Sequence, residues 1–260
     1  MKNVRLYGEK PYTIAVVHGG PGAPGEMAPV ARELSRDYGV LEPLQTKDSI
    51  DGQVEELAEV LKEYGNPPIV LVGWSYGATL GYILTAKYPA LIRKLILVGA
   101  TSFIEKYAAS VVYDELTRLT EEERAEVFSL EESIRGDYGG DKSASLARLF
   151  RLFIQADSYD PLPHKEEVLE YQPEINERIG REVRKLLASG QLIKMGKRIR
   201  CPVAAIHGDH DPRLAEGVRE PLARVLKDFR FILLEKCGHE PWQEKSARAK
   251  FYEVLKKEIA

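Results

Sequence analysis

The sequence predicts an α/β fold in which a mostly parallel sheet is flanked by helices and interrupted by a helical insertion. Short runs rich in valine, isoleucine and leucine alternate with helical patterns over the first hundred residues, and the alternation returns after residue 198. Continuous apolar strands separated by helices are typical of a parallel sheet that is covered on both faces. From residue 101 to 197 the apolar residues follow helical spacing instead, as in the segment 145–154.

The boundaries of the individual elements follow from apolar runs and helix-breaking residues. In the first half we expect strands at 12–17, 40–44, 69–72 and 92–98, and helices at 27–37, 50–64 and 76–88. Leu57, Leu61 and Tyr64 repeat at helical spacing, and the following Gly-Asn-Pro-Pro segment ends that helix. In the last part we expect strands at 202–207 and 229–234, and helices at 214–227 and 242–259. The expected domains are a core of residues 1–100 and 198–260 and a helical cap, or lid, of residues 101–197.

Composition and charge narrow the class of function. The chain has 260 residues, of which 44% are hydrophobic and 30% charged, and this suits one large domain with a sizeable core. Its net charge of -3 provides no basic surface of the kind that binds nucleic acid. The amino-terminal segment has no apolar stretch long enough for a signal peptide, and no run is long enough to span a membrane. We therefore expect a cytoplasmic protein that does not bind nucleic acid, and its small-molecule or short-peptide substrate need not be strongly charged.

One serine stands between two glycines where an apolar run stops, in the segment Gly73-Trp74-Ser75-Tyr76-Gly77. This G-x-S-x-G pattern follows an expected strand and precedes an expected helix, which is the setting of a nucleophile elbow. A strand that turns directly into a helix strains the backbone of the central residue, and neighbouring chains pass so close that flanking side chains would collide. The turn places the Ser75 hydroxyl at the carboxyl edge of the sheet and at the amino end of a helix. Ser75 is therefore the expected nucleophile.

A serine hydroxyl needs a base and a group that orients the base. The loop after the next-to-last strand carries Asp209 and Asp211, and the loop after the last strand carries His239. His239 is the expected base. We prefer Asp211 as the orienting acid, because the loop must first turn at Gly208 and Asp209 is better placed to bond the turn backbone. Together with Ser75 these residues follow the chain order serine, acid, histidine.

An oxyanion formed by attack on a carbonyl group needs two N–H donors. The amide of Tyr76, directly after the nucleophile, is the expected first donor. The second is expected in the loop that follows the first predicted strand, which reads HGGPG. Pro21 has no N–H, so the donor is Gly19 or Gly20, and we favour Gly20. Gly19 and Trp74 are expected to border the substrate pocket.

These motifs together resemble the α/β-hydrolase superfamily, because HGGPG, GWSYG, the late aspartate and the histidine of CGHEPW follow the order that the superfamily uses. HGGPG is particularly similar to the proline iminopeptidase branch. The resemblance implies an α/β-hydrolase fold, a serine hydrolase with the triad Ser75, Asp211 and His239, and no cofactor or metal. In that branch, carboxylates of the cap hold the free amine of the substrate. The candidates in this chain are Glu131, Glu132, Asp157 and Asp160.

The expected substrate depends on how the chain departs from that branch. The segment 41–48 has no Asp-Gln-Arg-Gly sequence, which the branch usually carries after its next strand. A carboxylesterase that forms an acyl-enzyme is therefore the first expectation, and an aminopeptidase acting on amino-terminal proline is the second. An alternative of another class is a dinucleotide-binding protein, because residues 20–25 match G-x-G-x-x-G and Glu42 lies where a ribose-binding acid is expected. Pro21 and Pro24 count against it, since they remove two N–H groups from a phosphate site.

Overall fold

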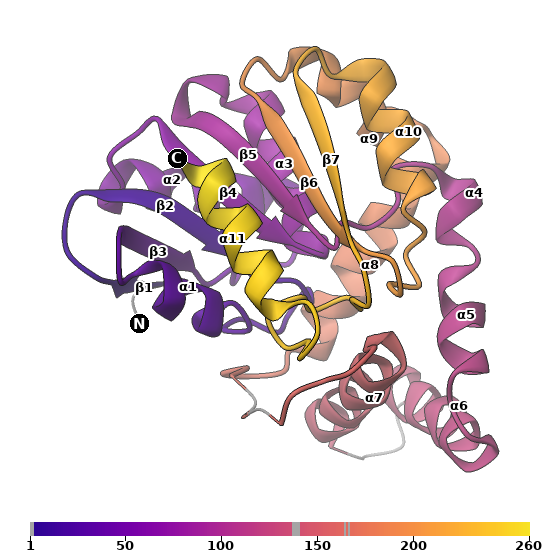
Figure 1. The fold of residues 1–260 in the computed structure, drawn as a ribbon. Helices are drawn as coiled ribbons and strands as arrows, with labels where there is room; N and C mark the ends of the chain where they lie inside the picture. The colour runs from indigo at the N-terminus through magenta and orange to yellow at the C-terminus, as the bar shows by residue number, and fades with distance from the viewer. Residues whose placement is uncertain (1–2, 137–140, 164, 166) are drawn as a thin grey trace.

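The computed structural model of the chain describes residues 3–136, 141–163, 165 and 167–260. Its centre is a sheet with the strand order β1-β3-β2-β4-β5-β6-β7 (Figure 1). β1 runs antiparallel to β3, and the other neighbouring pairs are parallel. The strands are β1 (Val4–Tyr7), β2 (Tyr12–Val17), β3 (Gly39–Pro43), β4 (Ile69–Trp74), β5 (Ile92–Val98), β6 (Val203–Gly208) and β7 (Phe229–Leu234). The expected mostly parallel sheet is confirmed.

Helices cover both faces of the sheet, because most of its strands are apolar on both sides. One layer consists of α2 (Ile50–Tyr64), α3 (Tyr76–Lys87) and α10 (Glu216–Val225), and the other of α1 (Ala28–Leu34) and α11 (Arg248–Ile259). Along β2, Ala15 and Val17 pack with the first layer while Ile14 and Val16 pack with the second, as the two-residue period of a strand requires. Since both faces are covered, polar chemistry is confined to the edge where the parallel strands end.

Some element boundaries differ from the expected ones for physical reasons. β1 has only four residues, too few to show a strand period, and it goes unpredicted from the sequence. α2 has the expected bounds, and its N-cap Ser49 accepts a hydrogen bond from the Gly52 N–H at 3.2 Å. The last helix begins at Arg248 and not at 242. The preceding segment is held in turns, because the buried Glu244 carboxylate accepts main-chain N–H groups from Tyr159 and Asp160 beyond α7 and from Gly238 in its own loop.

The segment between β5 and β6 is helical over much of its described part. Its α-helices are α4 (Glu105–Ala108), α5 (Val111–Thr117), α6 (Glu121–Arg135), α7 (Lys142–Asp157), α8 (Pro173–Ala188) and α9 (Gln191–Met195). A short 3-10 helix at Gly196–Arg198 follows α9, and another at Pro89–Leu91 lies before β5. α6 and α7 share a small apolar cluster of their own and lie apart from the sheet in Figure 1. Ile179 of α8 and Leu192 of α9 belong instead to the cluster on the α3 side of the sheet. None of the helices in the described part of the chain has the length and hydrophobicity that a membrane span needs.

Candidate active site

Ser75 lies between the last residue of β4 and the first residue of α3, and this turn strains its backbone. Its φ of 53° and ψ of -119° fall in a region that residues with side chains rarely adopt. The flanking glycines make the turn possible. A Cβ at Gly73 would lie 2.3 Å from the carbonyl oxygen of Gly77, and a Cβ at Gly77 would lie 2.4 Å from that of Val17. The half-buried Ser75 hydroxyl therefore stands at the amino end of α3, as the sequence pattern predicts.

Asp211 and His239 meet at one edge of the sheet, because each lies in the loop after one of two neighbouring parallel strands, β6 and β7. Nδ1 of His239 lies 2.7 Å from Oδ2 of Asp211, a hydrogen bond that orients the imidazole. Asp209 has another role, since its Oδ1 accepts the main-chain N–H of Cys237 at 3.1 Å. Of the two aspartates in this loop, Asp211 is the one that contacts the histidine.

Buried neighbours set the charge of Asp211. Burial alone would raise the pKa of this carboxyl, but His239, His207 and Arg213 outweigh burial and hold the pKa well below its usual range. Nε2 of His207 lies 3.7 Å from Oδ2 of Asp211, and burial lowers the pKa of that imidazole. Asp211 is therefore a carboxylate at neutral pH. It can hold Nδ1–H of His239 and leave Nε2 unprotonated, as a base requires.

Trp74 and Gly99 hold the His239 loop against the turn that carries Ser75. Nε1–H of Trp74 donates to the His239 carbonyl oxygen at 2.9 Å, and the two ring centroids are 5.2 Å apart. A Cβ at Gly99 would lie 2.9 Å from Nδ1 of His239, so glycine permits this approach. Among the residues that the structure describes, no hydrogen bond joins the Ser75 hydroxyl to His239. Catalytic hydrogen bonds are often long without substrate and tighten when it binds.

Gly19 and Trp74, expected at the substrate pocket, pack against each other beside the nucleophile. A Cβ at Gly19 would lie 2.4 Å from the Trp74 ring and 3.0 Å from Cβ of Ser75. Trp74 is 3% exposed, and its ring meets that of Trp242 edge-on at 5.1 Å between centroids. Gly19 thus lets the loop pass close over the turn, and Trp74 supports the histidine. Neither residue lines the large cavity near the site.

The two N–H groups expected to stabilise the oxyanion, those of Tyr76 and Gly20, differ in their hydrogen bonding. Tyr76 is the first residue of α3, so its N–H has no acceptor within the helix. The buried Tyr76 hydroxyl donates to Gln53 at 2.8 Å and anchors this end of the helix. The Gly20 N–H donates to Oε2 of Glu26 at 2.9 Å, so a carboxyl group already contacts this amide. Gly20 can therefore serve an oxyanion when its N–H is shared with Glu26 or released by it.

Glu42, the candidate ribose-binding acid of the dinucleotide alternative, is occupied by other contacts. It is 0% exposed and accepts hydrogen bonds from Tyr7 at 2.7 Å and from Arg5 at 3.3 Å, both on β1. The helix after the glycine-rich loop, α1, has only seven residues and begins three residues beyond the last glycine of the motif. Glu42 therefore serves the edge of the sheet, and the motif does not open a helix.

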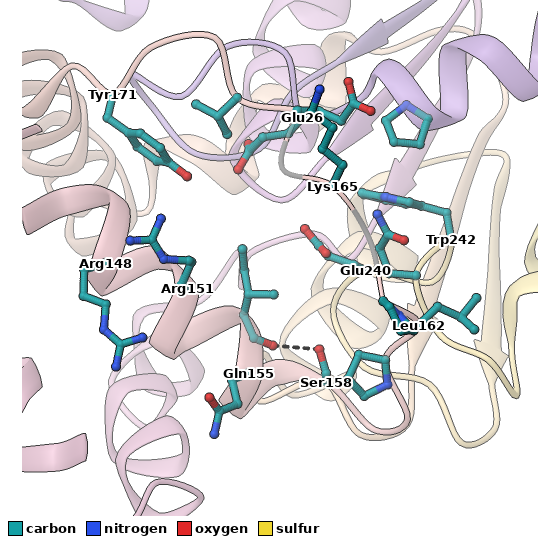
Figure 2. A pocket seen from close by; sticks show the side chains of 17 residues that line it. Glu26, Arg148, Arg151, Gln155, Ser158, Leu162, Lys165, Tyr171, Glu240 and Trp242 are labelled. Carbon is teal, nitrogen blue, oxygen red and sulfur yellow. Dashed lines mark hydrogen bonds between the residues drawn. The ribbon is translucent and has the colours of Figure 1, made fainter. Parts of the chain in front are cut away.

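A cavity of about 530 Å³ lies between α7 and the loops that precede α8 and α11 (Figure 2). Ile154, Leu162 and Trp242 are among its apolar lining residues, and Glu26 and Glu240 are among its polar ones. Ser75 and His239 do not line it. It adjoins the predicted catalytic residues through two neighbours, because Glu240 directly follows His239 in the chain and Glu26 contacts the predicted oxyanion donor Gly20.

Glu240 is a buried carboxyl directed into this cavity, as Figure 2 shows. Its residue is 9% exposed, and no described residue forms a hydrogen bond or ion pair with its side chain. Burial, with further contributions from Asp157 and Glu244, raises the pKa of Glu240 to about 8. A buried polar group without a protein partner points to a ligand or water as the missing partner.

The cap carboxylates that the resemblance suggested lie away from this cavity. Glu131 pairs with Arg135 at 3.1 Å on α6, and Asp157 is buried and bound to Arg213. Glu132 and Asp160 do not line the cavity either. Among the described residues, the carboxyl groups that do line it are those of Glu26, Glu167 and Glu240. Only Glu240 has a signal in the sequence, its position directly after the predicted catalytic histidine.

Residues 12–245 match the family model of the alpha/beta hydrolase fold. The chain belongs to the alpha/beta hydrolase family. This hydrolase shares its fold with the crystal structure of VinJ, with a TM-score of 0.66 and 17% sequence identity over 98% of this chain and 93% of that one. Within the described residues of the hydrolase, no group of three or more His, Cys, Asp or Glu side chains is arranged to hold a metal ion.

Two curated relatives of the hydrolase are a peptidase and an esterase. It is 34% identical over 126 residues to the proline iminopeptidase of Saccharolobus solfataricus, a match that covers 42% of this chain and 38% of that protein. It is 25% identical over 207 residues to the pimeloyl-[acyl-carrier protein] methyl ester esterase of Nitrosospira multiformis, covering 74% of this chain and 69% of the relative. The first match therefore spans well under two thirds of the relative's length.

Proposed function

We propose that this hydrolase cleaves a carboxylic ester through an acyl-enzyme on Ser75, with His239 as the base and Asp211 as the acid that orients it. The observation that carries the proposal is the 2.7 Å hydrogen bond between His239 and Asp211, at the edge of the sheet where the strained turn presents Ser75. Family membership, together with esterase and peptidase relatives, supports hydrolysis as the reaction.

In the proposed reaction His239 accepts the proton of Ser75 while Oγ attacks the ester carbonyl. Asp211 stays ionised, because its pKa is held low, and stabilises the imidazolium that forms. The N–H groups of Tyr76 and Gly20 stabilise the oxyanion. The imidazolium then protonates the leaving alcohol. Finally His239 activates a water molecule, which releases the carboxylic acid from Ser75.

We also propose that residues 101–197 act as the cap that shapes the substrate site. α7 supplies several lining residues of the cavity, including Ile154. The volume of about 530 Å³ suits a ligand of small or medium size. Apolar lining residues such as Ile154, Leu162 and Trp242 favour an ester whose acyl or alcohol part is partly apolar. The methyl ester esterase among the relatives supports the same substrate class.

Active-site labelling tests the reaction class without knowledge of the substrate. A fluorophosphonate should label the wild type, and Ser75→Ala should abolish labelling because no other residue is the nucleophile. Ser189→Ala, a change of the same kind at an exposed serine beyond the end of α8, is the matched control and should label normally. Equal labelling of Ser75→Ala and the wild type would contradict the proposal. Turnover of p-nitrophenyl esters of increasing acyl length then defines the substrate.

An aminopeptidase acting on amino-terminal proline is the second candidate, and Glu240 is the observation that favours it. A carboxyl group that is buried, directed into the cavity and without a hydrogen-bond or ion-pair partner among the described residues is chemically suited to an ammonium group. An ammonium bound there would pair with the carboxylate form and so lower the pKa of Glu240. The proline iminopeptidase of Saccharolobus solfataricus, 34% identical over the matched residues, supports the same class.

Glu240→Gln separates the two candidates. For an aminopeptidase, the change should lower kcat/KM for proline naphthylamide at least about tenfold, because the charge partner of the substrate amine is lost. For an uncharged p-nitrophenyl ester, kcat/KM should stay within about threefold. The matched control is Glu235→Gln, at an exposed glutamate in the same loop. A wild type that turns over esters and leaves proline naphthylamide intact would exclude the aminopeptidase.

A further inference from the structure

A largely buried arginine lies directly behind the acid of the proposed triad. Arg213 donates its main-chain N–H to Oδ1 of Asp211 at 2.9 Å, and Nη1 of its guanidinium lies 3.7 Å from the same oxygen. The Arg213 side chain is 17% exposed. Its carbonyl oxygen bonds Nε2 of His207 on β6, so the main chain of Arg213 is fixed on both sides of its Cα. The guanidinium is therefore held in place to act on the Asp211 carboxylate.

Two acids of the helical insertion hold this guanidinium from its other side. Asp157, the last residue of α7, forms a hydrogen-bonded ion pair with Nη1 of Arg213. Oε1 of Glu115 on α5 lies 2.9 Å from Nη2. Burial raises the pKa of Glu115 despite the opposing charge of Arg213. The flat guanidinium can bond several carboxyl oxygens at once, which a lysine cannot do.

Asp157 also contacts the histidine through its main chain. The Asp157 carbonyl oxygen accepts the His239 N–H at 3.0 Å. The preceding residue, Gly238, packs so closely that a Cβ there would lie 2.1 Å from that oxygen. One residue at the end of α7 is thus connected to both Asp211 and His239. It reaches Asp211 through Arg213 and reaches His239 directly.

We propose that Arg213 and Asp157 are positioning residues through which the end of α7 sets the geometry of the acid and the base. This inference rests on the proposed roles of Ser75, Asp211 and His239. α7 also lines the cavity along its length, with residues that include Ile154. The helix that contacts a bound substrate is therefore the helix that holds the triad, so cavity occupancy and triad alignment are mechanically linked.

The pH dependence of such an arrangement involves charged and titratable groups from several elements. Those around Arg213, Asp211 and His239 are Glu115 of α5, Asp157 of α7, His207 of β6, Asp209 and His210 of the loop after β6, Glu240 and Glu244 of the loop before α11, and Arg118 at the end of α5. Removing Arg213 leaves this surrounding more negative, which favours a protonated imidazole. Removing the Asp157 charge has the opposite effect.

The test measures the rate of fluorophosphonate labelling of Ser75 against pH, which needs no known substrate. Arg213→Gln should slow labelling at least about tenfold. Arg213→Lys should recover part of the rate, because lysine restores the positive charge but lacks the several N–H donors of the planar guanidinium. The acid limb, which is the part of the pH profile where the labelling rate falls toward low pH, should move to higher pH in Arg213→Gln and to lower pH in Asp157→Asn. Each shift should be about half a pH unit. The control is Glu253→Gln, which breaks an exposed ion pair with Lys250 on α11, away from α7 and the cavity, and should behave as the wild type.

Circular dichroism and thermal unfolding check that each variant is folded. If Arg213→Gln does not fold, the test uses the pH profile of Asp157→Asn. Opposite displacements of the two acid limbs support the inference, since a purely structural role would slow labelling without them. Folded variants that label at the wild-type rate, or that slow with unmoved limbs, overturn the inference alone. A wild type that no fluorophosphonate labels overturns the proposed function and this inference with it.

Discussion

Replacing Glu240 with glutamine should stabilise the protein at alkaline pH and leave its stability almost unchanged at acidic pH. Burial raises the pKa of Glu240 to about 8 from an ordinary value of 4.5, so the folded state keeps a proton that the unfolded state releases. Below about pH 4.5 both states are protonated, and the carboxyl behaves as its amide isostere. As the pH rises toward 8 the unfolded state ionises first, and the wild type loses stability that the variant retains.

The size of the effect follows from the gap between the two pKa values. A gap from 4.5 to about 8 corresponds to a ceiling of about 5 kcal/mol, because one pH unit is worth about 1.4 kcal/mol. The carboxyl borders a cavity of about 530 Å³ into which water can penetrate, and this lowers the penalty of ionisation. We therefore expect Glu240→Gln to be about 1–3 kcal/mol more stable than the wild type above pH 8.

Urea unfolding followed by tryptophan fluorescence, near pH 4 and near pH 9, measures this difference. Glu115, whose pKa is also raised to about 8, contributes equally to both proteins and cancels in the comparison. Glu235→Gln, at an exposed glutamate in the same loop, controls for the chemical change alone. A variant whose stability relative to the wild type is the same at both pH values would refute the reasoning.

Further predictions concern the serine turn and the loop above it. Gly77→Ala should lower the free energy of unfolding, measured in urea, by about 3 kcal/mol, because its Cβ would lie 2.4 Å from carbonyl oxygens at the end of β2. A variant as stable as the wild type would show that the turn can relax. Ser75→Gly should be more stable than Ser75→Ala by about 1–2 kcal/mol, because only glycine adopts this backbone without strain; equal melting temperatures would argue against stored strain. Glu26→Gln should raise the labelling rate about threefold or more, because it removes a negative charge from the Gly20 amide; slower labelling would instead assign Glu26 a supporting role.

Local rules explain which parts of the site could be predicted from the sequence. The turn at Ser75 is predictable because its strand, helix and two glycines are adjacent in the chain. The choice of Asp211 over Asp209 depends on turn chemistry within three residues, and the structure accordingly places Asp209 on the Cys237 N–H. The meeting of Asp211 with His239 needs one further rule, that parallel strands end at a common edge.

Features that depend on distant pairing of buried charges could not be predicted. Arg213 reads as a loop cation, yet its partners Glu115 and Asp157 lie 98 and 56 residues away in the chain. Glu26 lies only six residues from Gly20 in the chain. Its hydrogen bond with the Gly20 N–H nevertheless depends on the backbone path of the loop, whose prolines and glycines permit several paths. The edge strand β1 escapes prediction because four residues carry too little pattern.

The separate apolar cluster that joins α6 and α7, in which Leu152 is fully buried, has a consequence for how the sequence of this enzyme can diverge. Because none of these apolar residues belongs to the two clusters that cover the sheet, α6 can open locally without exposing the sheet, and its amide hydrogens should exchange faster than those of β4 and β5. Mutations inside that pair can also be repaired by its own neighbours. A lineage can therefore vary the apolar faces of α6 and α7 while it keeps the end of α7 that contacts Arg213 and His239.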